Sequence, residues 1–411
     1  MKTISPTHID GSLPAPASKS MMQRAIAIAT LAQGTSILHG YTPSNDSDAA
    51  LAIAHDLGAK VNKRNDVIEI NGNFSPRTHT LNCGEAGLGI RMFTPIAALW
   101  HERITLQGEG SLKTRPIETL VQPLLDLGAE IQTNNGFVPV HVKGPLKGGT
   151  AHVEGNLSSQ ILTGLLIASA YAQTDTTFAV HELKSKPYID MTIQIMHDFG
   201  VAVANDNYQR FFVKSGQQYQ AQQYSVEGDW SGAAFLLVAG ALGGRVTVSN
   251  LRSDSRQADM AILDALKKAG AAIQWKGHSI TVTKNRLNAF EFDATECPDL
   301  FPPLVALAVH CKGITKIKGV GRLFHKESNR AAVLQQEFMK LGANITIEGD
   351  EMLVQGGRVQ GGRIFAHNDH RIAMAAACAA ICAENRVEIE NHECVAKSYP
   401  HFFEDFALIS N

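Results

Sequence analysis

A strong charge of either sign is missing from this sequence. The 411 residues include 37 lysines and arginines and 39 aspartates and glutamates, which gives a formal net charge of −2. Proteins that hold a nucleic-acid backbone or an anionic membrane use a positive field that such a chain lacks. An anion-binding site must therefore come from local clustering of cations.

Long apolar runs are also missing. The longest, residues 232–244 and 372–383, are shorter than the ~18–20 residues that cross a bilayer. Residues 1–6 lead straight into polar sequence, without the apolar core of about 7–15 residues that marks a secretory signal. We therefore expect a cytoplasmic protein that contacts neither membrane nor nucleic acid.

Motifs for metals and for common cofactors are absent. The six cysteines form no CxxC pair and no zinc-like group, so we expect reduced thiols in the core. No Walker phosphate loop exists, because Ser18 precedes Lys19 where that motif needs glycine. The chain also has no G-x-G-x-x-G fingerprint and no H-E-x-x-H. These gaps disfavour an ATPase, a dinucleotide enzyme and a metal site.

What the sequence does contain is an internal repeat. A helix-like run that ends in glycine and passes into a strand-like run occurs five times, and its glycines stand at positions 58, 128, 200, 270 and 342. They are 70 or 72 residues apart, and each suits the left-handed position that ends a helix. A strand-like segment precedes each copy, and a sixth copy ends the chain. We therefore predict six repeats of about 68 residues.

A second series of helices alternates with the first. Its first turns fall near residues 19, 85, 158, 229, 299 and 369. These segments are apolar nearly all round and rich in alanine, leucine and glycine, which is typical of buried helices. The sequence therefore predicts an α/β fold of βαβαββ-type repeats, with the second helix series in the core.

Cations gather at the first turn of the buried helices and in the loop before the other helix of each repeat. They are Lys19, Arg24, Arg91, Lys113, Arg115, Lys186, Arg256, Lys326, Arg330, Arg371 and Lys397. Helix N-termini add N–H groups and partial positive charge, each stabilising an anion by ~0.3–1 kcal/mol. We predict a focused cationic cleft that holds two or more phosphate or carboxylate groups.

Acids interrupt these cations at Asp46, Asp48, Asp229, Asp299, Glu327 and Asp369. We interpret Asp229 and Asp369 as helix caps or salt-bridge partners. Asp299 and Glu327 are candidates for proton transfer, since both lie among the cations. Neighbouring cations would lower the pKa of these two carboxyls and burial would raise it, and the sequence leaves open which effect is larger.

Eight segments, in order and at the repeat spacing, resemble the 5-enolpyruvylshikimate-3-phosphate synthase family. They are PASKSMMQRA (16–25), KTRPIETL (113–120), SSQ (158–160), LKSKPYID (183–190), VEGDWS (226–231), HKESNR (325–330), NDHR (368–371) and VAKSYP (395–400). The resemblance implies a two-domain enolpyruvyl transferase fold with three repeats per domain around buried helices. It places one domain at residues 18–227, mainly for shikimate 3-phosphate, and the other at 1–17 and 228–411, which completes the phosphoenolpyruvate site. The chain would cross at hinges near 17 and 227, and the domains would close on substrate.

The resemblance also implies a reaction. The 5-hydroxyl of shikimate 3-phosphate would attack C2 of phosphoenolpyruvate while C3 gains a proton, and phosphate would then leave. This is a step of the shikimate pathway towards chorismate and the aromatic amino acids, and it needs no metal and no organic cofactor. The partners would be these two small molecules, and we expect a monomer.

Site residues follow from the resemblance, position by position. The proton-transfer residues would be Asp299, which accepts the 5-hydroxyl proton, Glu327, which works at C3, and Lys19 as a third candidate. Phosphoenolpyruvate would be bound by Lys19, Gly87, Arg91, Arg115, Gln160, Arg330, Arg371 and Lys397. Shikimate 3-phosphate would be bound by Lys19, Ser20, Arg24, Ser158, Ser159, Gln160, Ser185, Tyr188, Asp299 and Lys326.

The chain departs from the family pattern at two places. Where many members have GNAGTAMR, residues 84–91 are GEAGLGIR, so Glu85 adds negative charge and Leu88 removes a donor near the expected phosphoenolpyruvate site. Gly87 and Arg91 keep their places, and we expect binding with altered affinity. Arg322 stands where an asparagine that contacts shikimate 3-phosphate is usual.

Two alternative functions stay open. A UDP-N-acetylglucosamine enolpyruvyl transferase would share the fold, but it usually carries a cysteine in the loop that corresponds to residues 111–116, which have none. An inactive anion-binding paralogue would explain the changes at residues 85 and 88. The intact residues Lys19, Asp299, Glu327 and Lys397 argue against it. A protein that processes RNA ends would need a basic stripe that the sequence does not contain.

Overall fold

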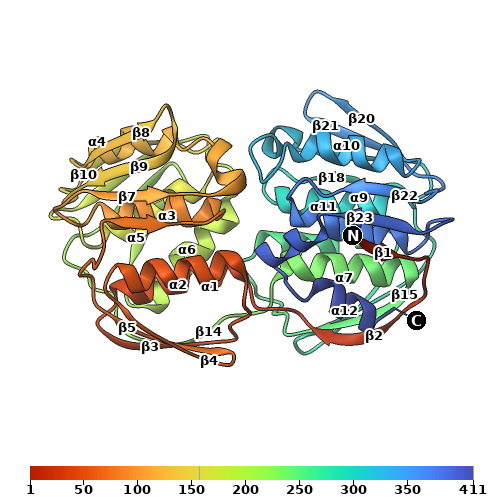
Figure 1. Cartoon of the computed structure of the whole chain (residues 1–411), viewed down its shortest axis with the longest axis horizontal. Coiled ribbons are helices and arrows are strands. Elements are labelled where there is room, and N and C mark those ends of the chain that lie inside the picture. Colours follow the sequence, from red (N-terminus) through yellow and green to blue (C-terminus); the bar gives the residue numbers. More distant parts are fainter. Residues whose placement is uncertain (157, 411) are drawn as a thin grey trace. The chain divides into compact units, whose positions relative to one another are not determined.

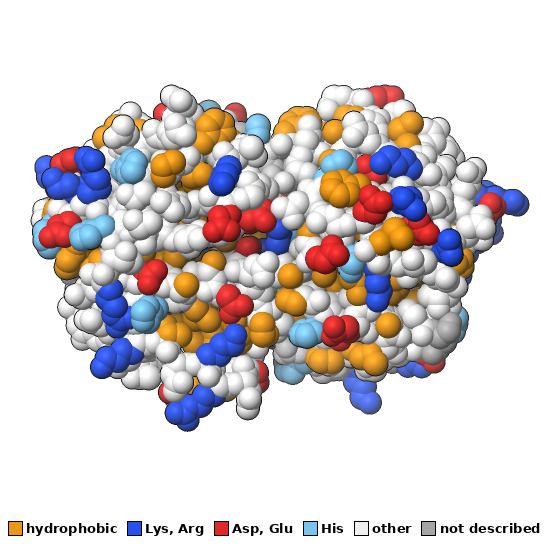
Figure 2. All heavy atoms as spheres, viewed as in Figure 1, with side chains coloured by type: hydrophobic (Ala, Val, Ile, Leu, Met, Phe, Trp, Pro, Cys, Tyr) orange, Lys and Arg blue, Asp and Glu red, His pale blue; other side chains and the backbone are white. Residues whose placement is uncertain are grey.

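The computed structural model describes residues 1–156 and 158–410. The chain forms two compact units: Lys19–Val226, and Met1–Ser18 together with Glu227–Asn411 (Figure 1). We call the first the central unit and the second the terminal unit. On the face drawn in Figure 2, basic and acidic side chains are interspersed, in keeping with the low net charge.

The predicted βαβαββ repeat is confirmed, and one sheet pattern recurs. The first strand pairs parallel with the second, the second antiparallel with the fourth, and the fourth antiparallel with the third; the sheet order β6-β7-β9-β8 is an example. Two parallel strands need a long crossover connection, and the buried helix lies in the connection between the first and second strands. A short turn joins the antiparallel third and fourth strands.

The central unit holds three such sheets among its described residues, ordered β14-β3-β5-β4, β6-β7-β9-β8 and β10-β11-β13-β12. Its elements are α1 (Lys19–Leu31), β3 (Gly34–His39), α2 (Asn45–Asp56), β4 (Lys60–Arg64), β5 (Val67–Gly72), β6 (Thr80–Asn82), α3 (Gly87–Ala97), β7 (Ile104–Gln107), the 3-10 helices η1 (Gly110–Thr114) and η2 (Glu118–Leu120), α4 (Val121–Asp126), β8 (Glu130–Asn134), β9 (Phe137–Lys143), β10 (Gly149–Glu154), α5 (Gln160–Ser169), β11 (Thr176–His181), α6 (Lys186–Asp198), β12 (Val203–Asp206), β13 (Arg210–Val213) and β14 (Gln223–Ser225).

The terminal unit also holds three sheets in the part that the structure describes, ordered β2-β15-β17-β16, β18-β19-β21-β20 and β22-β23-β1. Its elements are β1 (Lys2–Ile4), β2 (Ile9–Pro14), α7 (Trp230–Gly243), β15 (Gly244–Ser249), η3 (Ala258–Ala261), α8 (Ile262–Ala269), β16 (Ala272–Lys276), β17 (Ser279–Thr283), β18 (Glu291–Asp293), η4 (Pro298–Leu300), α9 (Phe301–Ala308), β19 (Ile314–Lys318), η5 (Val320–Leu323), α10 (Arg330–Lys340), β20 (Asn344–Glu348), β21 (Glu351–Gln355), β22 (Gly362–Phe365), α11 (His370–Ala380), β23 (Val387–Glu390), η6 (His392–Lys397) and α12 (Phe402–Leu408).

One repeat in each unit takes a strand from a distant part of the chain. β14 pairs parallel with β3, so the last strand of the central unit completes the sheet of its first repeat. β2 pairs parallel with β15 in the terminal unit, although the whole central unit separates the two strands in sequence. In each unit one repeat is thus completed by a strand that is distant in sequence, and the central unit is inserted between β2 and the rest of its repeat.

The six helices predicted to be buried form the cores of the units, and each begins within two residues of its expected start. Every residue of α3, α9 and α11 is buried, and α7 is buried except at Ser231. In the central unit α3 packs against α1 and α5, and in the terminal unit α7, α9 and α11 pack against one another. Their all-round apolar sequences suit this position, because every face meets another element.

The five repeat glycines have the predicted left-handed backbone. Their φ angles are 113°, 81°, 89°, 100° and 87° at Gly58, Gly128, Gly200, Gly270 and Gly342. At Gly58 a Cβ atom would also lie 2.5 Å from the carbonyl oxygens of Asn73 and Ser75. Glycine is required there for both reasons.

The cysteine prediction needs one correction. All six cysteines are free thiols and five are buried, but Cys382 is exposed. It lies two residues beyond the end of α11, whose own residues are all buried, so the alanine-rich apolar segment does not bury every cysteine in it. No helix in the described part of the chain is long and apolar enough to span a membrane.

Candidate active site

Asp299 is the centre of a charged cluster in the terminal unit. Its Oδ1 accepts hydrogen bonds from Lys326 Nζ at 3.2 Å and Arg330 Nη1 at 2.9 Å, and its Oδ2 accepts one from Arg371 Nη2 at 2.9 Å. Burial acts to raise the pKa of Asp299, but these three cations outweigh it and hold the pKa well below its usual range. For Asp299 the cations therefore have the larger effect, and it is an ionised acceptor.

Arg330 is a fully buried guanidinium surrounded by acids. Its Nε and Nη2 donate to the two oxygens of Asp369 at 2.9 and 3.1 Å, and Nη2 also donates to Glu327 Oε2 at 2.6 Å. Burial alone would lower the pKa of Arg330, but Asp369, Glu327 and Asp299 outweigh it and raise the pKa. The bidentate pairing fixes the plane of the guanidinium and, through it, the carboxylates of Asp299 and Glu327.

Asp369 also caps a core helix, as predicted. Its Oδ1 accepts the Arg371 backbone N–H at 3.1 Å at the start of α11, and its Oδ2 accepts the Ser328 hydroxyl at 3.0 Å. Lys397 Nζ donates to the Asn368 carbonyl at 2.6 Å, just before this cap. The short segment 368–371 therefore contains the cap Asp369, the cation Arg371 and the carbonyl of Asn368 that accepts from Lys397.

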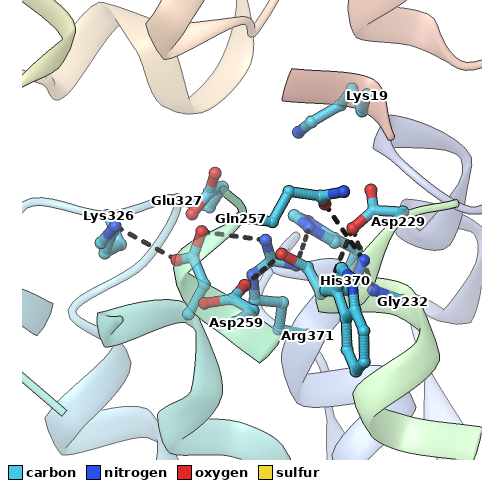
Figure 3. A network of polar contacts seen from close by, with 12 residues as sticks. Lys19, Asp229, Gly232, Gln257, Asp259, Lys326, Glu327, His370 and Arg371 are labelled. Carbon is cyan, nitrogen blue, oxygen red and sulfur yellow. Dashed lines mark hydrogen bonds and ion pairs between the residues drawn. The ribbon is translucent and has the colours of Figure 1, made fainter. Parts of the chain in front are cut away.

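The start of α7 brings a further carboxyl to this cluster. Asp229 caps α7 by accepting the Ser231 and Gly232 backbone N–H groups at 2.7 and 3.2 Å, which confirms the predicted cap. The Ser231 hydroxyl donates to Asp259, and Figure 3 shows Asp259 beside Arg371. Burial and the negative charge of Asp299 raise the pKa of Asp259 to about 7.

Asp259 was missed by sequence analysis. It lies in η3, in the loop before the second helix of its repeat, where the other repeats carry their polar residues. That position was a signal, but its neighbours Ala258 and Met260 are apolar and no charged motif marks it.

In the central unit, Arg24 links three core and surface helices. Its Nε donates to Thr192 Oγ1 at 2.8 Å, its Nη1 to the Ser20 carbonyl at 2.8 Å, and its Nη2 to Thr163 Oγ1 at 3.3 Å. These acceptors are neutral, and burial lowers the pKa of Arg24 to about 10, so the guanidinium still carries its charge at neutral pH.

The predicted serines and Tyr188 lie at the starts of the helices that Arg24 joins. Ser159 is the N-cap of α5, and the Ser158 hydroxyl accepts the Gln160 N–H at 3.2 Å. Ser185 precedes α6 with a left-handed φ of 57°, and the Tyr188 carbonyl accepts the Thr192 hydroxyl at 2.8 Å. Arg24 thus joins α1 to α5 and α6, and the predicted serines lie at the N-termini of α5 and α6, a common place for anion binding.

Arg91 and Arg115 form a second cationic group at the start of α3. Arg91 Nη1 donates to the Gly87 carbonyl at 3.0 Å and to Gln160 Oε1 at 3.2 Å, and its Nη2 donates to the Pro116 carbonyl at 2.7 Å. A Cβ atom at Gly87 would lie 2.3 Å from Arg115 Nη1, so the Arg115 guanidinium rests on the glycine. Both arginine side chains are buried and meet at Gly87, the first residue of α3.

Lys19 is the first residue of α1, and its Nζ lies 2.8 Å from Asp46 Oδ2. All of the site residues expected in residues 18–227 lie in the central unit, and Asp299, Lys326, Glu327, Arg330, Arg371 and Lys397 lie in the terminal unit. In the terminal unit Asp299, Lys326, Glu327, Arg330 and Arg371 form one network of contacts, and in the central unit Arg91 contacts Gln160.

Comparisons with known proteins assign the family. The family model described as EPSP synthase (3-phosphoshikimate 1-carboxyvinyltransferase) matches residues 4–406. The chain belongs to the EPSP synthase family. A relative from Clostridium kluyveri named 3-phosphoshikimate 1-carboxyvinyltransferase is 37% identical over 409 residues, which cover 98% of this chain and 96% of the relative. A relative of the same name from Clostridium beijerinckii is 35% identical over 416 residues, with the same coverage.

A solved structure of EPSP synthase from Acinetobacter baumannii matches the fold with a TM-score of 0.84 at 26% identity, covering 99% of this chain and 98% of that one. Membership of the EPSP synthase family agrees with the resemblance drawn from the eight sequence segments. The comparisons support neither a UDP-N-acetylglucosamine transferase nor an inactive paralogue.

Proposed function

We propose that this protein is a 3-phosphoshikimate 1-carboxyvinyltransferase of the shikimate pathway, which leads to the aromatic amino acids. The 5-oxygen of shikimate 3-phosphate forms a bond to C2 of phosphoenolpyruvate, and C3 takes up a proton. C3 then loses a proton, the C2–O bond to phosphate breaks, and the enol ether is left on the acceptor. The family match over residues 4–406 supports this reaction.

The ionised Asp299 among three cations is the observation that carries the proposal. A carboxylate whose pKa lies well below its usual range is ionised at neutral pH, so it accepts the hydrogen bond of the 5-hydroxyl. It takes up the proton as the C2–O bond forms, because bond formation makes that hydroxyl strongly acidic. Lys326 and Arg371 hold the two carboxylate oxygens in place at 3.2 and 2.9 Å. Such a positioned base contributes about 10²–10⁴-fold in rate.

Glu327 is proposed to move the proton at C3. Its Oε2 accepts from Arg330 Nη2 at 2.6 Å, so the guanidinium holds the carboxyl while its other oxygen can exchange a proton. Lys19 is the third candidate for proton transfer, at the first turn of α1.

The binding roles are proposed for each unit. In the central unit, shikimate 3-phosphate contacts Lys19, Ser20, Arg24, Ser158, Ser159, Gln160, Ser185 and Tyr188. There phosphoenolpyruvate contacts Lys19, Gly87, Arg91, Arg115 and Gln160. In the terminal unit, Asp299 and Lys326 serve shikimate 3-phosphate, and Arg330, Arg371 and Lys397 serve phosphoenolpyruvate. The forked guanidinium donors suit a carboxylate and a phosphate.

Phosphate release from phosphoenolpyruvate tests the reaction, with shikimate 3-phosphate and UDP-N-acetylglucosamine offered separately as acceptors to the purified protein. Release with shikimate 3-phosphate alone is expected. Release with UDP-N-acetylglucosamine alone would make the protein the sibling transferase. Folded protein that binds shikimate 3-phosphate but releases no phosphate would be an inactive paralogue.

We further propose that the protein works as a monomer in the cytoplasm. Membership of the EPSP synthase family supports the location. Light scattering on the purified chain would report its mass directly, and a mass of twice 44.3 kDa would contradict a monomer.

A further inference from the structure

Two loops of the second repeat interlock at the start of α3. One is residues 84–87, which lead into α3, and the other is residues 109–116, which contain η1 and Arg115. The Glu109 backbone N–H donates to the Gly84 carbonyl at 2.7 Å, so the loops are joined through their backbones. Glu85 adds a side-chain link between them.

The Glu85 carboxylate closes the first turn of η1. Its Oε2 accepts both the backbone N–H and the hydroxyl of Ser111, each at 2.8 Å. The N-cap residue of η1, Glu109, provides no side-chain cap of its own. Glu85 therefore caps η1 from another loop. A carboxylate at a helix N-terminus is also attracted by the partial positive charge of the N–H groups there.

The fit between the loops is tight. Gly110 has a φ of 45°, and a Cβ atom there would lie 2.3 Å from the Glu85 carboxyl carbon. Any side chain at Gly110 would push Glu85 off Ser111. Glycine at position 110 thus leaves the room that the Glu85 carboxylate occupies.

The C-terminal end of residues 109–116 is held by the motif GEAGLGIR, which also contains Glu85. Arg91 Nη2 donates to the Pro116 carbonyl at 2.7 Å, and the Arg115 guanidinium rests on Gly87. Glu85 and Arg91, six positions apart in the motif GEAGLGIR, therefore fix the two ends of residues 110–116. Arg115 lies between these fixed ends.

We propose that Glu85 is a positioning residue for phosphoenolpyruvate: by holding η1 through Ser111, it keeps Arg115 over the first turn of α3. This inference rests on the proposed function, in which Arg115 binds phosphoenolpyruvate. The negative charge of Glu85 is directed at the Ser111 donors, which stabilise it. The acid at this position therefore supports anion binding at Arg115.

Steady-state kinetics of Glu85→Ala, Glu85→Gln and Glu102→Ala test the proposal. Glu102 is the matched control, an exposed acid of the same repeat whose carboxylate lies 3.5 Å from His79. Hydrogen bonds to a charged group change an equilibrium by roughly 10- to 100-fold, so Glu85→Ala should raise the KM for phosphoenolpyruvate by about 10-fold or more. The KM for shikimate 3-phosphate should stay within about twofold, and Glu102→Ala should change neither.

Glu85→Gln distinguishes positioning from charge. The glutamine amide oxygen can accept the same two hydrogen bonds, so this variant should restore the KM for phosphoenolpyruvate to within about threefold of the unchanged protein. Ser111→Ala removes one of the two bonds and should give a smaller rise than Glu85→Ala. It serves as the test variant if Glu85→Ala does not fold.

Hydrogen exchange gives a readout that needs no turnover. The Ser111 amide of Glu85→Ala should exchange at least about 10-fold faster than that of the unchanged protein, because its acceptor is gone. Equal exchange, equal KM for phosphoenolpyruvate in Glu85→Ala and Glu102→Ala, or a glutamine variant no better than alanine would each overturn the proposal. If the unchanged protein released no phosphate with shikimate 3-phosphate while Ser111 exchange still depended on Glu85, the proposed function would fail and the loop contact would stand.

Discussion

Replacing Asp369 by alanine removes the carboxylate that keeps a guanidinium buried in the terminal unit. The side chains of Asp369 and Arg330 are both fully buried, and two hydrogen bonds of 2.9 and 3.1 Å join them. The substitution also removes the cap that accepts the Arg371 backbone N–H. Two separate stabilising contacts are thus lost at one position.

The expected loss of stability follows from those contacts. Removing one partner of a buried ion pair costs ~3–5 kcal/mol, and losing an N-cap costs ~1 kcal/mol. Glu327 and Asp299 stay on Arg330 and offset part of the cost, so we expect about 3 kcal/mol in total. For a unit of about 200 residues, each kcal/mol lowers the melting temperature by ~2–4 °C. The melting temperature should therefore fall by about 10 °C.

Thermal unfolding of the full chain, followed by circular dichroism without substrates, measures this shift. Asp254→Ala is the matched control, because it breaks an ion pair of 2.7 Å with Arg252 that is exposed to solvent. Exposed pairs contribute little, so the control should melt with the unchanged protein. Asp369→Asn should fall between the two, since its amide oxygen can still cap α11 but carries no charge.

A melting temperature for Asp369→Ala within about 2 °C of the Asp254→Ala control would refute the reasoning. It would mean that Glu327 and Asp299 compensate the buried Arg330 fully without Asp369.

Three further predictions concern activity and pH. Glu327→Gln should lower turnover at least about 100-fold and leave the KM for shikimate 3-phosphate nearly unchanged, and near-normal turnover in the phosphate-release assay would remove its role at C3. Gly87→Ala should raise the KM for phosphoenolpyruvate at least about 10-fold with little change in melting temperature, because the new Cβ displaces the Arg115 guanidinium; an unchanged KM would show that this contact is not needed. The folded protein binds a proton at Asp259 more tightly than the unfolded chain does, since its pKa rises from 3.8 to about 7, so this carboxyl favours folding at low pH and the benefit is lost as pH rises through 7. The free energy of unfolding of Asp259→Asn, measured with urea, should therefore rise relative to that of the unchanged protein between pH 5 and 8. If the two free energies changed with pH in the same way, the raised pKa would be contradicted.

Local signals made the repeat predictable. A glycine that ends a helix and an apolar helix that needs burial on every side are properties of short segments, and the folded units keep both. The pairing of β14 with β3 was not predictable in the same way, because the partners are far apart in sequence and each is compatible with other sheets.

For the charged residues too, local roles were predictable from the sequence and roles that depend on distant contacts were not. Asp229 and Asp369 were predicted as caps, because a cap acts on the turn that follows it. Asp259 was not predicted as a site residue. Its hydrogen bond comes from Ser231 and part of its raised pKa from Asp299, and both residues lie on other elements. Glu85 was expected to place negative charge near a bound anion, whereas the fold gives its carboxylate two donors on Ser111.

The sequence by itself determined the repeat, the buried helices, the family and the residue types available for binding anions, because each of these depends on spacing and composition along the chain. The tertiary structure alone decided which charges meet. It set three cations on Asp299, three carboxylates on Arg330 and a loop amide on Glu85, and through these contacts it decided the ionisation of Asp299 and Asp259. Charge interactions fall off with distance through space, and distance through space is what a sequence does not contain.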